Sequence, residues 1–114
     1  MTTETRNKVL ERDGYTCQRC GTPLSSMNAE IAHRICNSRA ALKWIQRYAM
    51  ENYQTYLSNV QAQDVLDHPH NLRTACRYKK AGSNCNDSFN CFNNPEEASS
   101  ILEMIFTDIG IIKN

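Results

Sequence analysis

The sequence predicts a small α+β domain in which helices predominate. Two long segments carry apolar residues at helical spacing, and two short runs between them have the alternation of brief strands. A chain of 114 residues has room for one domain of ordinary size, so residues 1–114 are interpreted as a single domain.

Each end of the chain is expected to be helical. Residues 3–13 are predicted to form a helix, because Thr3 can cap it and Gly14 is placed to end it. The last helix, predicted over residues 95–109, has the clearest signals: Asn94 stands at the cap position, proline follows, and two glutamates face the positive end of the helix dipole.

The middle of the chain is predicted to hold a strand, a helix and a second strand. Residues 30–35 form a brief alternating run that places His33 beside apolar neighbours, and residues 71–76 form a second run able to pair with it. Ser38 can cap a helix that continues to about residue 57. Its apolar stripe is interpreted as packing and comprises Leu42, Trp44, Ile45, Tyr48, Ala49, Tyr53 and Tyr56.

Two shorter segments complete the expected organisation. Residues 58–70 are polar and contain Pro69, so they are predicted to be a connection. Residues 86–92 are predicted to form a short helix.

Six cysteines in a short chain favour either disulfides or a metal site. The N-terminal residues 1–6 lack the apolar core of a secretion signal, so a reducing, cytoplasmic environment is expected and metal binding is favoured. The spacing Cys17-x-x-Cys20-Gly21 is typical of a zinc knuckle. A thioredoxin-like redox pair is disfavoured because no βαβ pattern surrounds it. The second pair of ligands can come from Cys36, Cys76, Cys85 and Cys91.

The net charge does not identify a partner, and the hydropathy excludes a membrane helix. The formal net charge is +1, so binding to nucleic acid must come from local clusters of basic residues. No apolar stretch approaches the roughly 20 residues of a membrane helix, so no membrane association is expected.

A family resemblance rests on four motifs, taken in chain order. They are Arg6-x-x-Val9-x-x-Arg12-Asp-Gly-Tyr-x-Cys17-x-x-Cys20-Gly21, then Glu30-Ile-Ala-His33, then Asn71-Leu-x-x-x-Cys76, and finally Cys85-Asn86-x-x-x-Asn90. Through them, residues 6–90 resemble the small zinc-containing HNH endonucleases. The resemblance implies a ββα-metal (His-Me finger) core over about residues 15–93 with flanking helices. It also implies a structural Zn²⁺ bound by Cys17, Cys20, Cys76 and Cys85, with Cys91 as the reserve ligand.

The resemblance further implies hydrolysis of phosphodiester bonds in DNA, by nicking or by double-strand cleavage. His33 would be the general base, Asn71 would hold it in orientation through a hydrogen bond, and Asn86 would occupy the last motif position. A neutral imidazole suits the task of accepting a proton near neutral pH.

A catalytic Mg²⁺ or Mn²⁺ is expected at Asn86 and Asn90, which would share one helical face, together with Glu30. Many relatives have a metal ligand immediately before the general base, but this chain has Ala32 there. That departure favours an alternative, a zinc-stabilised DNA-binding module that has lost catalysis. Other candidate ligands are Asp87, His68 and His70.

Basic residues near the motifs are candidate contacts to DNA phosphates. Three of them belong to an insertion between Cys76 and Cys85. The protein is expected to be a monomer or a homodimer, the latter because one ββα site cuts one strand. The candidate phosphate contacts are Arg34, Arg39, Arg73, Arg77, Lys79 and Lys80.

Overall fold

The computed structural model of the chain describes residues 1–76, 85 and 89–113. In this part the fold is α+β and roughly half helical, with a two-stranded antiparallel sheet, which confirms the coarse class predicted. The elements are α1 (Thr3–Arg12), β1 (Ala29–His33), α2 (Arg39–Tyr53), α3 (Asn59–Leu66), a 3₁₀ turn η1 (Pro69–Asn71), β2 (Leu72–Cys76) and α4 (Pro95–Asp108).

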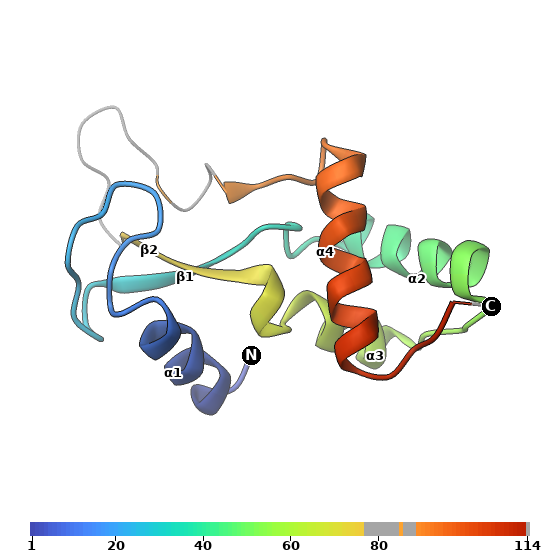
Figure 1. The fold of residues 1–114 in the computed structure, drawn as a ribbon, viewed down its shortest axis with the longest axis horizontal. Coiled ribbons are helices and arrows are strands. Elements are labelled where there is room, and N and C mark those ends of the chain that lie inside the picture. The colour runs from blue at the N-terminus through green and yellow to red at the C-terminus, as the bar shows by residue number, and fades with distance from the viewer. Residues whose placement is uncertain (77–84, 86–88, 114) are drawn as a thin grey trace.

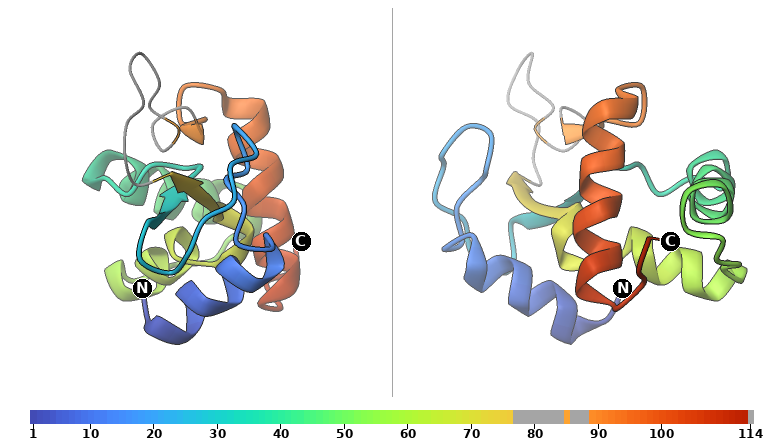
Figure 2. Two further views of the ribbon diagram at one scale, coloured as in Figure 1. Left: turned by 90° about the vertical axis from the view of Figure 1, so that its left-hand side faces the viewer. Right: turned by 45° about the vertical axis from the view of Figure 1, so that its right-hand side comes forward.

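The molecule is elongated, with principal extents of 44 × 28 × 20 Å. Figures 1 and 2 show α1, the loop that follows it and the β1–β2 pair at one end, and α2 and α3 at the other. Helix α4 lies between the sheet and α2 (Figure 1). The two halves have separate clusters of buried residues, so each half needs its own source of stability.

The predicted pairing of the two extended runs is confirmed. Ala29 lies opposite Cys76, and His33 lies opposite Leu72 at the other end of the ladder. Strand β1 ends at His33, two residues earlier than predicted. Because successive side chains in a strand point to opposite faces, Ala32 and His33 face different sides of the sheet.

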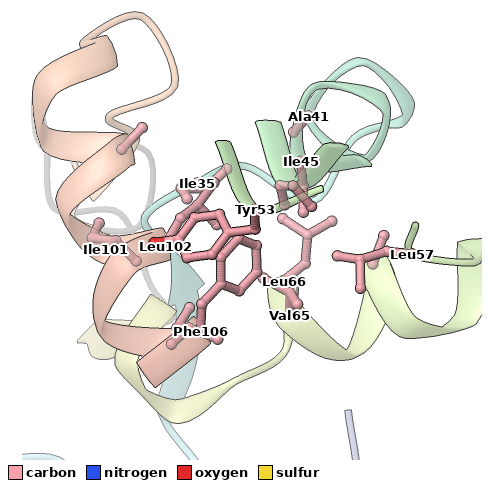
Figure 3. Packing of buried hydrophobic residues seen from close by; sticks show 14 of the residues in the cluster. Ile35, Ala41, Ile45, Tyr53, Leu57, Val65, Leu66, Ile101, Leu102 and Phe106 are labelled. Atoms are coloured by element: carbon pink, nitrogen blue, oxygen red, sulfur yellow. The ribbon is translucent and has the colours of Figure 1, made fainter. Parts of the chain in front are cut away.

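The larger core is built by α2, α3 and α4 (Figure 3). Phe106 of α4 packs edge-on against Tyr53 of α2, with ring centroids 4.9 Å apart at an interplanar angle of 85°. Aromatic pairs favour this arrangement because the positive ring edge meets the negative ring face. The apolar side of α4 is therefore core: Ala98, Ile101, Leu102, Ile105 and Phe106 are all buried.

The caps predicted for the two long helices are confirmed. Ser38 Oγ accepts the Ala41 N–H at 3.1 Å, and Asn94 Oδ1 accepts the Glu97 N–H at 3.3 Å. Each bond satisfies an amide that has no partner within its helix. At the far end of α4, Gly110 adopts the left-handed backbone (φ +85°) in which glycine ends helices without steric cost.

Several predictions about local structure were wrong. Helix α2 ends at Tyr53 because Gln54 takes a left-handed conformation (φ 45°), so the helix stops short of residue 57. Tyr56 is consequently 72% exposed and lies outside the packing stripe. At the N-terminus, Thr2 caps α1 in place of Thr3.

The segment 58–70 was expected to be a connection, yet it contains α3. Ser58 Oγ accepts the Gln61 N–H at 3.1 Å, and the Gln61 side chain accepts the Ser58 N–H at 2.9 Å, which is a reciprocal capping box. The expected helix over residues 86–92 lies partly outside the described residues, and it does not include residues 90–92.

Candidate metal centre and histidine site

The four cysteines of the expected zinc site come together at the end of the sheet. One sulfur from each of Cys17, Cys20, Cys76 and Cys85 lies within 4.8 Å of the others. Cys20 Sγ and Cys76 Sγ are 3.4 Å apart. Four sulfurs about 2.3 Å from a tetrahedral zinc stand roughly 3.8 Å from one another, so the cluster has the dimensions of a structural metal site.

Local backbone geometry positions the two knuckle cysteines. The Cys17 N–H donates to Thr22 O and the Gly21 N–H donates to Cys17 O, both at 2.9 Å. Gly21 takes a left-handed conformation (φ +76°), which suits a residue without a Cβ. The knuckle is tied to β2, because the Gln18 N–H donates to Thr74 O at 2.9 Å.

The thiol electrostatics fit a cation at this position. Hydrogen bonds from Thr22, followed by those from Cys76 and Cys17, lower the pKa of Cys20 to about 6. Burial and the neighbouring thiols raise the pKa of Cys76 to about 12. With no positive charge among them, the four sulfurs therefore do not all ionise at neutral pH. A divalent ion would replace the shared protons and couple its binding to folding.

The smaller core surrounds this cluster and contains little else. Its buried members are Cys17, Ala32, Ala75 and Cys85, with Leu24, Cys76 and Phe89 packed against them. So small an apolar cluster contributes little burial free energy by itself, and a bound metal would add to the stability of this half. The remaining cysteines lie elsewhere: Cys36 and Cys91 pack in the larger core.

His33 is paired with a residue that the sequence analysis did not select. His33 Nε2 and Asp67 Oδ1 are 2.9 Å apart, and both side chains are 16% exposed. Burial opposes ionisation of Asp67, yet hydrogen bonds from His33 and Gln63 hold the pKa of Asp67 below its usual 3.8. At neutral pH, Asp67 is thus an acceptor only, so the neutral imidazole donates through Nε2 and keeps the lone pair of Nδ1.

Asn71 is fully buried, and its side chain binds backbone and not the imidazole. Its Oδ1 accepts the Ile35 N–H at 2.7 Å, and its Nδ2 donates to Ile35 O at 3.1 Å and to Leu66 O at 2.8 Å. In the described residues, these three bonds to backbone replace the expected hydrogen bond from Asn71 to His33, and we call them the Asn71 clamp. The clamp fixes the chain just after β1, while Asp67 contacts the imidazole itself.

The expected ligands of a catalytic Mg²⁺ or Mn²⁺ are not gathered in the described part of the chain. Asn90 Oδ1 accepts the Phe92 N–H at 2.9 Å, a local turn that competes with metal binding. Glu30 belongs to neither group of potential ligands found among the described residues, and Ala32 is buried beside the cysteines. Asn86 lies outside the described residues.

The candidate phosphate contacts differ in their surroundings. Arg34 forms an ion pair with Glu97 of α4. Arg73 donates to the carbonyls of His70 and Leu72, and burial followed by nearby Arg12 and Arg34 lowers its pKa. Arg39 is exposed at the start of α2. Arg77, Lys79 and Lys80 lie outside the described residues, as does the alternative ligand Asp87.

No protein-family model, curated protein or solved structure matches the chain. Within the described residues, no helix has the length and apolar character needed to cross a bilayer.

Proposed function

We propose that this chain is a DNA endonuclease that hydrolyses phosphodiester bonds with His33 as general base. The single observation that carries the proposal is the 2.9 Å contact between His33 and Asp67. A base held by a carboxylate through one ring nitrogen, with the other nitrogen free to take a proton, is the recurring arrangement of histidine catalysis.

In the proposed reaction, His33 Nδ1 takes a proton from water as the water oxygen bonds to phosphorus. The bond from phosphorus to the leaving sugar oxygen then breaks, and solvent protonates that oxygen. Asp67 remains ionised throughout, holds the ring and stabilises the imidazolium that forms. Asn71 fixes the backbone that follows His33 and has no chemical role.

The family resemblance implies a Mg²⁺ or Mn²⁺ ion, which when bound would stabilise charge on the leaving oxygen. Among the described residues, its expected oxygen ligands are not gathered at one site. Cleavage that is lost in EDTA and restored by Mg²⁺ or Mn²⁺ would support a role for this ion.

Basic residues support DNA as the substrate. Arg12, Arg34 and Arg73 lie near one another and form a basic region, in which Arg12 pairs with Asp13 and Arg34 with Glu97, so a phosphate would compete with these carboxylates. Such a region attracts phosphates through a salt-sensitive interaction that carries no sequence information.

The second candidate is a zinc-stabilised DNA-binding module without catalysis, favoured by Ala32. The test is cleavage of supercoiled plasmid by wild type and His33→Ala, each with Mg²⁺, Mn²⁺ or EDTA, beside a gel-shift assay. Cleavage by wild type and its loss in His33→Ala supports the nuclease. Binding without cleavage by folded wild type supports the module, and neither binding nor cleavage refutes both.

A further inference from the structure

A second cluster of metal-ligating side chains lies where η1 packs against the C-terminal end of α4. His68 Nε2 and Asp108 Oδ2 are 2.8 Å apart, and the His68 and His70 ring centroids are 4.9 Å apart. One potential ligand atom from each of the three residues lies within 4.8 Å of the others. Neither the cysteine cluster nor the contact between His33 and Asp67 uses these side chains.

We propose that His68, His70 and Asp108 bind a divalent metal ion of the zinc class. Two imidazole nitrogens and one carboxylate oxygen suit Zn²⁺, Co²⁺ or Ni²⁺, whereas Mg²⁺ prefers oxygen ligands alone. Three protein ligands leave at least one coordination position for water, as in zinc sites that remain open. This site is independent of the proposed function, because it takes none of the residues that act on DNA.

The cluster is reachable from solvent. His70 and Asp108 line a surface hollow of about 580 Å³, together with Glu103 and other residues of α4. The Asp108 side chain is 57% exposed and the His68 side chain is 14% exposed. An ion can therefore enter from the side of Asp108, while the histidines are partly screened from water.

The hydrogen bonds of His68 limit how tightly this site would bind an ion. The His70 N–H donates to His68 Nδ1 at 3.1 Å, so neutral His68 carries its proton on Nε2 and donates it to Asp108. A metal ion on Nε2 would shift the ring proton to Nδ1 and break the bond from His70. We therefore expect this site to bind more weakly than four thiolates.

A bound ion would join two segments that are distant in sequence. Residues 68–70 lie between Asp67, which contacts His33, and Asn71, which clamps the chain after β1. The ion would fasten this stretch to α4. Occupancy would therefore raise the thermal stability of the protein in addition to any effect of metal on the cysteines.

The test uses the 114-residue chain carrying one equivalent of zinc, dialysed against Co²⁺ and analysed for bound cobalt. Wild type should take up one further equivalent, with no added sulfur-to-cobalt charge-transfer absorption. His70→Gln and Asp108→Asn should lose that equivalent, and Glu103→Gln, which removes a carboxylate from the same hollow, should keep it.

Three results would overturn the proposal: no further uptake by wild type, uptake retained in both ligand variants, or uptake lost equally in Glu103→Gln. Circular dichroism of each variant establishes that it is folded. Should one ligand variant fail to fold, the other decides the question.

Discussion

Replacing Asn71 by alanine is expected to destabilise the protein severely. The side chain is fully buried and makes three hydrogen bonds to backbone, at 2.7, 3.1 and 2.8 Å. Each is worth about 1 kcal/mol net, and buried backbone groups left without partners add to the cost, so a loss of about 3–5 kcal/mol is expected. Domains of this kind are stable by only about 5–15 kcal/mol, so much of the total would be lost.

The loss is measured as the free energy of unfolding in urea, with the melting temperature as a second readout. At about 4 °C per kcal/mol, the melting temperature should fall by roughly 12–20 °C. Asn37→Ala is the matched control, because Asn37 is exposed and its Oδ1 accepts a single bond from Gln63 at 3.0 Å. A loss below about 1 kcal/mol for Asn71→Ala would refute the clamp.

Two further predictions concern the metal centre and acid stability. Cys85→Ser should lose bound zinc and unfold at a lower temperature. Cys91→Ser should keep its zinc, since Cys91 packs in the larger core. Zinc retained by folded Cys85→Ser would exclude Cys85 as a ligand. Folding lowers the pKa of Asp67 below its usual 3.8, so ionised Asp67 stabilises the folded protein. This contribution to the free energy of unfolding is complete above pH 3.8 and is lost as the pH falls through the pKa of Asp67 in the folded protein. Asp67→Asn should therefore reduce the fall in unfolding free energy between pH 5 and about pH 2, and an unchanged fall would contradict this assignment.

Local signals in the sequence were sufficient to predict much of the fold. The caps at Ser38 and Asn94 and the pairing of β1 with β2 follow from residue types and periodicity over short segments. The grouping of the four cysteines was also predicted, from the knuckle spacing and the family resemblance.

The partner of His33 could not be predicted in the same way. Asp67 is 34 residues from His33, in a segment interpreted as a connection because of its polar composition. One local signal was present: Ser58 and Gln61 have the spacing of a capping box and mark the start of α3. Recognising α3 would have placed Asp67 at its end, but only tertiary packing brings that carboxylate to the imidazole.

Single-turnover cleavage of a labelled DNA duplex by wild type, His33→Ala and Asp67→Asn tests the central claim most directly. Asp64→Asn is the matched control, because Asp64 is an exposed carboxylate on α3, the helix that ends just before Asp67. We expect His33→Ala to slow cleavage by about 10²–10⁴-fold. Asp67→Asn should slow it by up to about 10⁴-fold through loss of the correct orientation and tautomer of the imidazole, with Asp64→Asn near wild type. Folded Asp67→Asn or His33→Ala protein that cleaves at the wild-type rate would contradict the account.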